Sequence, residues 1–404
     1  MTGKFIAPLD KKVAVVFSRF GPYHLARMNG AHEPLAKAGG ELVAIAVAGS
    51  DRVYQWEAVD KPADYSTEVL FPDRSYEAIS ERALKERLHT VLNELNPIAV
   101  ALPGWWFPES KIGLQWCREN RRAAILMSES AQGDHRRLWP REFAKQWLVR
   151  QFHAALVGGS RHAEYARSLG MPRACIFTGY DAVDNDYFVR ESERVRANAA
   201  AERAAAQLPE RYILSSSRFV AKKNLDGLLR GYALYVEQNP AAPALVLCGD
   251  GPLRASLVEL INILHLNARV TLPGFIQYPE LPRYYGLADA FIIASTIEQW
   301  GLVANEAAAS GLPLLVSNRC GSAPELVIEG ENGYTFNPTP PQAIAEAFAK
   351  LPADKEALAQ FGKRSREIVW THSPQIFGHN LLEASRIALA RLGREDLGPP
   401  GGIA

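Results

Sequence analysis

Short runs of apolar residues alternate with longer stretches of helical periodicity along this chain. Apolar runs of this length are typical of strands that are buried on both faces of a parallel sheet. They lie at residues 12–18, 42–47, 98–102, 123–127 and 154–158 in the first half, and at 212–216, 244–248, 270–272, 290–294 and 312–316 in the second. This alternation predicts an α/β fold in which each half of the chain forms a parallel sheet.

Other segments carry weaker patterns. Residues 53–74 hold aromatic and charged residues without clean periodicity, so we expect a loop with short edge pieces. The run at 154–158 is expected to be the final core strand of the first domain. Residues 191–208 predict one charged helix, residues 321–333 predict loops around a short helix, and residues 370–392 predict a long amphipathic helix.

The segment from residue 290 to residue 316 holds the strongest candidate chemistry. Its order is strand, polar loop, helix and strand, and ligands in such units lie where the loop meets the helix N-terminus. The backbone N–H groups of Gly301, Leu302 and Val303 have no partner inside the helix. They would therefore favour an anion.

Glu298 and Glu306 flank this predicted anion site. Because carboxylates accept hydrogen bonds from sugar hydroxyls, the combination suits a ligand with both phosphates and hydroxyls. Taken singly, Glu298 also fits a solvated loop residue and Glu306 a charge on a helix face.

The string E-Q-W-G-L-V-A-N-E, followed by A-S-G-L-P, resembles the donor-binding signature of glycosyltransferase family 4 (glycosyl transferases group 1), retaining enzymes of the GT-B fold. Trp300 departs from that signature, since Phe or Pro is commoner there, and this bears on the shape of the sugar pocket.

The resemblance implies roles for residues of the second half. Glu298 would contact the transferred sugar, and Glu306 would contact the nucleotide ribose. Arg218 and Lys223, in the loop after the strand at 212–216, match the pair that holds the diphosphate. By themselves, two cations before a helix suit either a diphosphate or a solvated basic loop.

Two further loops of the second half would border the nucleotide base in the resembled family. Gly249 and Gly251 follow the strand at 244–248, where glycine permits either the close approach of a flat ligand or a tight turn. Phe275 follows the strand at 270–272.

The first half departs from the family at one position. Many members carry a His directly after the strand that corresponds to residues 123–127, beneath the transferred sugar. Here Ser128 and Glu129 occupy that place, and His135 comes several residues later. Either Glu129 or His135 fills the role, or no residue does, and a carboxylate at a strand end favours Glu129. Gly21, in the turn after the first strand, would lie near the donor phosphates and the acceptor.

The implied architecture is GT-B, with two Rossmann-like domains facing across a cleft and a last helix crossing back to the first domain. We predict an acceptor domain at 1–185, a nucleotide-sugar domain at 186–369 and the C-terminal helix at 370–404. The implied activity is retaining transfer of a sugar from a nucleotide sugar, with UDP-sugar favoured, to an acceptor hydroxyl in polysaccharide, lipopolysaccharide or glycolipid assembly. The alternatives are glycosylation of a small natural product, a GT-B epimerase, a glycan phosphorylase and a non-catalytic sugar-nucleotide binder.

Composition narrows these possibilities. A length of 404 residues suits two domains, and a net charge of +1 gives no general attraction for nucleic acid. The four Cys are widely spaced and indicate neither a zinc site nor disulfides. Since no Asp-x-Asp lies at a strand end, we expect no metal and no cofactor besides the donor substrate. The chain begins without a signal-peptide pattern and has no apolar run of membrane-spanning length, so we expect a cytoplasmic protein with at most peripheral membrane contact.

Overall fold

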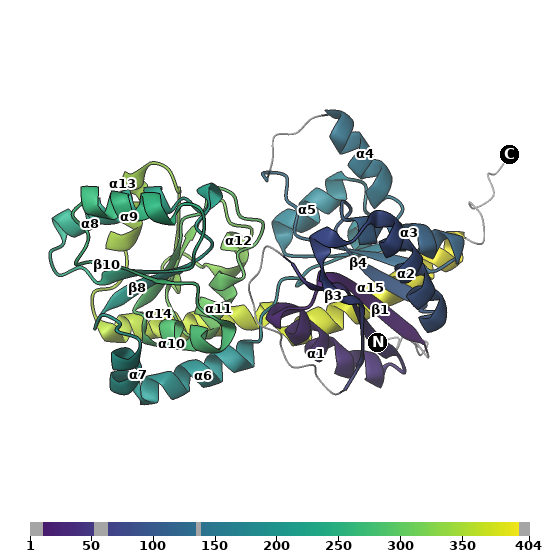
Figure 1. Ribbon diagram of the computed structural model, residues 1–404, viewed down its shortest axis with the longest axis horizontal. Coiled ribbons are helices and arrows are strands. Elements are labelled where there is room, and N and C mark those ends of the chain that lie inside the picture. Colours follow the sequence, from purple (N-terminus) through teal and green to yellow (C-terminus); the bar gives the residue numbers. More distant parts are fainter. Residues whose placement is uncertain (1–10, 52–63, 135–138, 396–404) are drawn as a thin grey trace, which may run out of the picture. The chain divides into compact units, whose positions relative to one another are not determined.

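The computed structural model describes residues 11–51, 64–134 and 139–395. These residues form two compact units (Figure 1). Unit 1 contains the described residues up to Ala182 and those from Ser373 onward, and unit 2 runs from Val183 to His372. The one-turn helix η5 (Trp370–His372), which the predicted limits assign to the C-terminal segment, groups with unit 2.

Unit 1 is built on a parallel sheet with the strand order β3-β2-β1-β4-β5-β6-β7. Its strands are β1 (Lys12–Arg19), β2 (Glu41–Ser50), β3 (Ser66–Ser75), β4 (Ala99–Pro103), β5 (Ala123–Ser128), β6 (Ala154–Val157) and β7 (Ile176–Phe177). In the central strand, Val13 pairs with Leu42 of β2 on one side and with Ala99 of β4 on the other. Because helices cover both faces of the sheet, β1 is a continuous apolar run rather than an alternating one.

The helices of unit 1 divide between those two faces. On the face that carries Val13, Val15 and Phe17 pack α1 (Pro22–Lys37) and α15 (Pro374–Glu395). On the opposite face pack residues of α2 (Glu81–Leu95), α3 (Pro108–Glu119), α4 (Trp139–Val149) and α5 (Ser160–Ser168).

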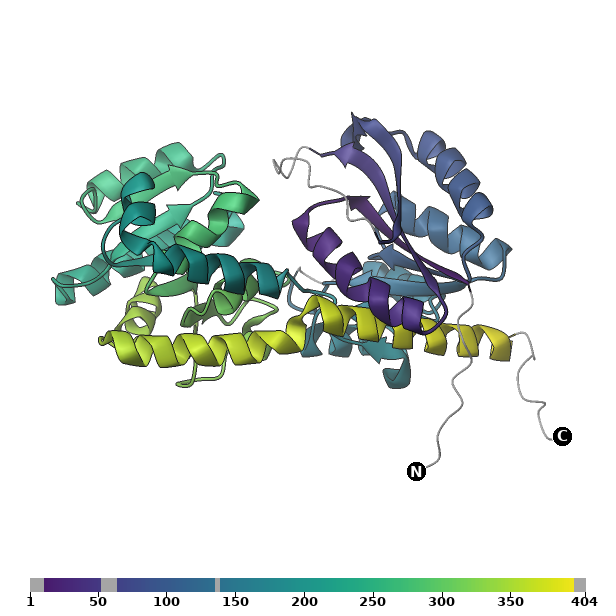
Figure 2. The same cartoon turned by 90° about the horizontal axis from the view of Figure 1, so that it is seen from below.

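The last helix, α15, packs along α1, as Figure 2 shows. Two glycines allow the helices to touch through their backbones. A Cβ atom on Gly30 would lie 2.1 Å from the carbonyl oxygen of Pro374, and one on Gly378 would lie 2.1 Å from that of Gly30. Any larger residue would push the helices apart. The predicted return of a C-terminal helix to the first domain is confirmed.

Unit 2 is built on a second parallel sheet with the strand order β10-β9-β8-β11-β12-β13. Its strands are β8 (Tyr212–Ser216), β9 (Ala244–Cys248), β10 (Val270–Gly274), β11 (Ala290–Ile293), β12 (Leu314–Ser317) and β13 (Gly333–Phe336). Its helices are α6 (Asn185–Ala197), α7 (Ala199–Ala205), α8 (Leu225–Gln238), α9 (Arg254–Ile263), α10 (Leu281–Leu287), α11 (Val303–Ala309), α12 (Ala323–Leu326), α13 (Pro341–Ala349) and α14 (Lys355–Val369). Both units are therefore Rossmann-like, as predicted.

The structure corrects four local expectations. Residues 66–75 form the edge strand β3 instead of short pieces, and Leu70 is its one buried side chain, which explains the weak pattern. The first sheet does not end with the strand at 154–158, because β7 follows it. The helix predicted at 191–208 is broken at Asn198 into α6 and α7. The loop expected at residue 333 begins a strand, β13.

Candidate functional site

The strand order of unit 2 reverses between β8 and β11. From β8 the sheet continues to β9 and β10 on one side, and to β11, β12 and β13 on the other. In open α/β sheets, ligands bind beyond the carboxyl ends of the strands at such a switch point. Two loops leave the sheet there, residues 217–224 after β8 and residues 294–302 after β11. These loops carry the predicted residues Arg218, Lys223 and Glu298.

The structure brings Lys223 and Glu298 into contact at the switch point. The Lys223 Nζ atom pairs with Oε2 of Glu298, and both side chains are 11% exposed. The Ser295 hydroxyl donates to the same carboxylate oxygen at 3.1 Å. The loops are also joined through their backbones, since the Thr296 N–H donates to the Lys222 carbonyl at 2.9 Å. A cation and a carboxylate are therefore held side by side at the switch point, where a ligand is expected.

Arg218 lies on the same loop and is exposed. The loop backbone around it is anchored, because the Phe219 N–H donates to the Asp250 carbonyl at 2.8 Å and the Phe219 ring is fully buried. The guanidinium therefore extends from a fixed backbone, as an anion-binding residue should.

Gly249 and Gly251 serve the packing of this loop. Their φ angles are +132° and +153°, which other residues avoid. A Cβ on Gly249 would lie 1.8 Å from the Ser217 carbonyl oxygen, and one on Gly251 would lie 2.7 Å from the Phe219 carbonyl oxygen. The close neighbour is thus the backbone of the Arg218 loop. The sequence left a flat ligand and a tight turn open as reasons for these glycines, and the structure shows that their space is required by the protein itself.

Phe275 joins the same edge of the sheet. It follows β10 and is 37% exposed. The Gly249 N–H donates to the carbonyl of Gly274, the preceding residue, at 2.7 Å. The two loops predicted to border a base are therefore hydrogen-bonded to each other.

Gly301, Leu302 and Val303 form the start of α11. Gly301 has a φ of +97°, and a Cβ there would lie 3.2 Å from Cγ of Glu298. Glycine therefore permits the turn that presents Glu298. Leu302 is the N-cap of α11 and Val303 its first residue, so their N–H groups lie in the first turn, where no intrahelical acceptor exists.

Trp300 belongs to the core of unit 2. Its side chain is 1% exposed, and its Nε1 donates to Oδ1 of Asn305 at 2.8 Å. The ring lies 5.2 Å from that of His372. Trp300, which departs from the family signature, therefore fills the interior of unit 2 behind the loop.

Glu306 differs sharply from Glu298 in its surroundings. It is fully buried in α11, and its Oε2 accepts a 2.6 Å hydrogen bond from the Tyr285 hydroxyl of α10. The Tyr285 ring contacts Phe188 and Phe291 edge-on or tilted at 5.8 and 5.9 Å. The structure thus places the second glutamate with α10, and the sequence analysis did not single out Tyr285.

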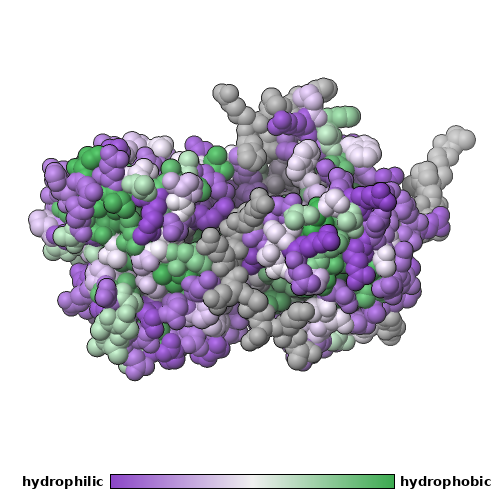
Figure 3. Space-filling model, viewed as in Figure 1, coloured by the Kyte–Doolittle hydropathy of each residue, from purple (hydrophilic) through white to green (hydrophobic). Residues whose placement is uncertain are grey.

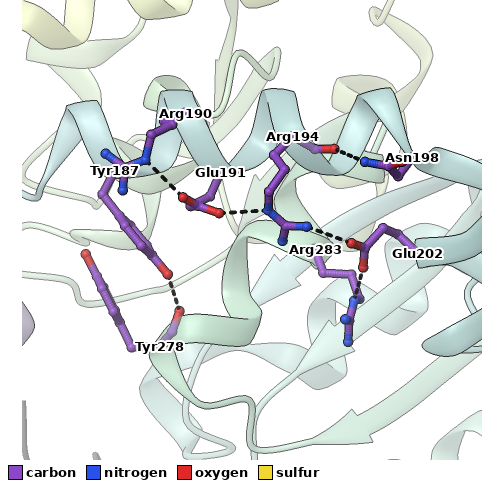
Figure 4. Close-up of polar contacts among 8 residues, drawn as sticks. All are labelled: Tyr187, Arg190, Glu191, Arg194, Asn198, Glu202, Tyr278 and Arg283. Atoms are coloured by element: carbon purple, nitrogen blue, oxygen red, sulfur yellow. Dashed lines mark hydrogen bonds and ion pairs between the residues drawn. The ribbon is translucent and has the colours of Figure 1, made fainter.

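A chain of ion pairs holds α10 against α6 and α7 (Figure 4). Glu202 of α7 accepts from Arg194 of α6 at 3.0 Å and from Arg283 of α10 at 2.7 Å. Beside this chain the rings of Tyr187 and Tyr278 stack at 5.0 Å. These contacts fix the helix that carries Tyr285, and through it they fix Glu306.

In unit 1, Glu129 belongs to a buried charged cluster. It follows β5 and is half-buried, and its carboxyl adjoins that of the fully buried Asp181. Arg27 of α1 is 2% exposed, and its guanidinium lies 4.5 Å above the Tyr180 ring. Burial, and then the charge of Glu129, raise the pKa of Asp181 well above its usual range, while Arg27 opposes the rise. His135, the other candidate for this role, lies outside the described residues.

Gly21 is the N-cap of α1, beside the switch point of the first sheet between β1 and β4. At this switch point the fully buried Glu109 of α3 accepts from the Ser18 hydroxyl at 2.6 Å and from the Tyr76 hydroxyl at 2.8 Å. Burial, and then the charges of Arg27 and Arg19, hold the pKa of the nearby His24 well below its usual range. A neutral His24 therefore stands one turn after Gly21.

Comparison with known proteins identifies this arrangement in unit 2. Residues 198–368 match the family described as Glycosyl transferases group 1. These residues belong to that family. The predicted family is confirmed, and the matched segment contains both loops of the switch point.

Curated relatives match parts of the chain. The N-acetyl-alpha-D-glucosaminyl L-malate synthase of Bacillus anthracis is 27% identical over 200 residues, which are 49% of this chain and 50% of that protein. The D-inositol 3-phosphate glycosyltransferase of Corynebacterium urealyticum is 28% identical over 269 residues, 63% of this chain and 62% of that protein. The matches thus span about half to three fifths of these relatives' length.

Solved structures match nearly the whole chain. The sucrose-phosphate synthase of Thermosynechococcus elongatus aligns with a TM-score of 0.68 and 20% identity over 96% of this chain and 99% of that one. HepE of Anabaena, in complex with UDP and glucose, aligns with a TM-score of 0.65 and 15% identity over 92% and 98%. At this identity the likeness shows the fold, which is GT-B as predicted.

No three His, Cys, Asp or Glu side chains of the described residues converge as metal ligands do. No helix in the described ranges is long and apolar enough to cross a membrane. The site residues that sequence reasoning missed are Ser295, Tyr285 and Asp181. Nothing in the sequence pairs Asp181 with Glu129.

Proposed function

We propose that this protein transfers a sugar from a nucleotide-sugar donor to a hydroxyl of an acceptor. The observation that carries the proposal is the contact between Lys223 and Glu298 at the switch point of the group 1 unit. A lysine offers a point charge to a diphosphate, and a carboxylate accepts hydrogen bonds from sugar hydroxyls. One ligand that meets both needs is a nucleotide sugar.

In the proposed reaction, the bond between the anomeric carbon and the β-phosphate oxygen breaks while the acceptor oxygen bonds to that carbon. Charge accumulates on the departing diphosphate, and Arg218, Lys223 and the first turn of α11 stabilise it. The acceptor proton passes to the departing phosphate on the same face, so the anomeric configuration is retained. With two cations and a helix N-terminus in place, this step needs no metal.

Glu306 is proposed to bind the ribose. Because it is fully buried and one oxygen is bound by Tyr285, the side chains that cover it must move when the nucleotide enters. Glu306→Gln should then weaken nucleoside diphosphate binding, and Tyr285→Phe should weaken it less. Equal affinity in wild type and Glu306→Gln, measured by calorimetry, would remove the ribose role.

We propose UDP-sugar as the donor. HepE, with the same fold, was solved with UDP and glucose, whereas a Mycobacterium tuberculosis relative, 30% identical over 193 residues, is named as GDP-mannose-dependent. That relative is a phosphatidylinositol monomannoside mannosyltransferase, and another, from Arabidopsis thaliana, is a sulfoquinovosyl transferase. These names support an acceptor of the polysaccharide, lipopolysaccharide or glycolipid class.

A thermal-shift panel tests the donor. A ligand at 100 times its Kd stabilises the folded state by about 2.7 kcal/mol. We expect UDP and one UDP-sugar to raise the Tm, with GDP and GDP-mannose giving no comparable shift. The absence of a shift with every nucleotide would refute the proposal. Product analysis then separates transfer from the alternatives, because an epimerase forms free sugar without an acceptor and a non-catalytic binder forms no product.

A further inference from the structure

A turn of unit 1 presents two adjacent aromatic side chains to solvent. The turn holds residues 104–107 and joins β4 to α3. Trp106 is 69% exposed, the highest value among the large hydrophobic side chains of the described residues, and Phe107 is 46% exposed. Rings of this size are normally covered, because leaving them in water forgoes their hydrophobic stabilisation. Their exposure at one turn indicates that a ligand covers them.

The backbone of this turn is fixed by contacts on both sides. The Gly104 N–H donates to a carbonyl of the neighbouring strand β5 at 2.5 Å, and the Ser110 hydroxyl donates to the Pro103 carbonyl at 2.6 Å. Trp105 is only 6% exposed, and its ring lies 5.9 Å from that of Tyr165. With this tryptophan anchored in the core, the two rings that follow it stand on an ordered backbone. A ligand that binds them does not have to order the turn first, which favours its affinity.

A lysine of α3 orients the more exposed of the two rings. The Lys111 Nζ atom lies over the Trp106 ring, 4.6 Å from its centre, which is the geometry of a cation–π contact. Because the ammonium covers one face of the indole, the opposite face is the one that a ligand can reach.

The turn also stands where open α/β sheets bind ligands. It follows the carboxyl end of β4, beside the switch point between β1 and β4. Pro103 of β4 pairs with Met127 of β5, so the half-buried Glu129 leaves the neighbouring strand at the same edge of the sheet. An open aromatic face and a carboxylate are therefore found at one edge.

A sugar ring fits these two groups. One face of a pyranose consists of C–H groups with a partial positive charge, and hydroxyl groups surround it. The face of an indole is negative, so it attracts those C–H groups while apolar surface leaves the water. Carboxylates accept hydrogen bonds from the surrounding hydroxyls.

A protein partner or a bilayer fits less well. Figure 3 shows the described apolar residues of unit 1 in small patches between hydrophilic ones. At their exposures the two rings offer roughly 150–300 Å², whereas a stable protein interface needs about 800 Å² from each partner. Surfaces that bind bilayers combine such rings with several cations. Residues 104–111 contain one cationic side chain, Lys111, and it lies against the indole.

We propose that Trp106 is a stacking platform for a sugar ring of the acceptor, with Phe107 beside it. This inference rests on the proposed function, and it narrows the acceptor to a glycan or to the glycan part of a glycolipid. The stacked ring presents a face without an axial hydroxyl, since such a hydroxyl would hold the sugar away from the indole. Lys111 keeps the platform in the orientation that the sugar meets.

An array of immobilised oligosaccharides of glucose, N-acetylglucosamine, galactose and mannose, probed with the full chain, tests the platform without the donor. We expect wild type to bind at least one of them. Removing a ring on which a nucleic-acid base stacks lowers affinity by about 5- to 150-fold, and Trp106→Ala should lose at least about tenfold on the same oligosaccharides. Trp106→Phe keeps a ring and should stay within about threefold of wild type.

A matched control comes from the same unit. Trp147 of α4 is 60% exposed, and Trp147→Ala should bind the array as wild type does. Circular dichroism and the Tm of each variant show that it is folded. Unchanged binding in folded Trp106→Ala, or no binding of wild type to any oligosaccharide, would overturn the proposal. So would binding to phosphatidylglycerol vesicles, or a dimer in size-exclusion chromatography, that Trp106→Ala abolishes, because the ring would then face a bilayer or a second copy.

Kinetics with an acceptor that wild type glycosylates separate this inference from the proposed function. Trp106→Ala should raise the acceptor KM at least about tenfold and change kcat by less than about threefold, because the stack is equally strong in the ground state and the transition state. An unchanged acceptor KM would overturn the platform and leave sugar transfer standing. If wild type transfers no sugar to any acceptor, the proposed function fails, and the array still decides whether Trp106 binds a glycan.

Discussion

Replacing Glu298 by Gln separates the roles of the two charges that meet at the switch point. In the structure, the Glu298 carboxylate pairs with Lys223 and accepts from Ser295, with both charged side chains 11% exposed. Removing one partner of a buried pair costs about 3–5 kcal/mol. Because a tenth of each side chain is exposed and the Ser295 contact survives, we expect a loss of about 1–3 kcal/mol in the free energy of unfolding. For a unit of this size, the Tm then falls by about 2–12 °C.

The same substitution has the opposite consequence for nucleotide binding. In wild type, a diphosphate competes with Glu298 for Lys223, and Gln is a weaker competitor. The affinity for nucleoside diphosphate in Glu298→Gln should therefore stay within about threefold of wild type or increase. Sugar transfer should nevertheless fall by about 10²–10³, because the carboxylate is proposed to contact the sugar in the transition state.

Calorimetry with UDP and with GDP, together with thermal unfolding, measures both effects. Lys223→Met should lower the affinity for nucleoside diphosphate by about 10- to 150-fold, as expected for the loss of a charge-assisted contact. Glu237→Gln, an exposed carboxylate on α8, is the control and should change stability by less than about 0.5 kcal/mol. A loss of more than tenfold in nucleoside diphosphate affinity in Glu298→Gln would refute the competition between carboxylate and diphosphate.

Three further predictions concern the proposed chemistry and unit 1. Arg218→Ala should lower turnover by about 10²–10³ with an unchanged Tm, and near-normal turnover would remove its diphosphate role. Activity should survive EDTA, and a loss that Mn²⁺ or Mg²⁺ restores would show that the proposed metal independence is wrong. The pKa of Asp181 is raised in the folded state, so the folded protein keeps a proton that the unfolded chain releases. The contribution of Asp181 to stability therefore falls as the pH rises above the ordinary pKa of an aspartate. Asp181→Asn should remove this loss of stability, which in wild type amounts to at most about 1.4 kcal/mol per pH unit. If the Tm of wild type and of Asp181→Asn changed in parallel from pH 4 to 8, the prediction would be wrong.

The fold was readable where burial leaves a continuous apolar run. The core strands β1 and β11 could be recognised from the sequence because both of their faces are covered and nearly all of their residues are apolar. The edge strand β3 does not, since most of its residues are only partly covered. In β13 only Gly333 and Phe336 are buried, and four residues are too few to show a period.

The sequence analysis named Lys223 and Glu298 as candidates, but it could not show that they touch. Lys223 and Glu298 lie 75 positions apart, and they meet because β8 and β11 are neighbours in the sheet. Strand order is a property of the whole fold, so no local pattern reveals the pair. The same holds for Glu129 and Asp181, which reach each other from β5 and from the segment beyond β7. Trp300 had only its family position to suggest a role, and the structure shows that it fills the core.

Release of nucleoside diphosphate from UDP-sugars, followed with and without candidate acceptor glycans and glycolipids, tests the proposed sugar transfer most directly. The account predicts that wild type releases UDP, that an acceptor accelerates the release, and that the sugar appears on the acceptor in the configuration of the donor. Glu298→Gln should bind UDP and yet release it at least about 100-fold more slowly from the sugar nucleotide. Unimpaired release in Glu298→Gln, or a transferred sugar of inverted configuration, would contradict the account.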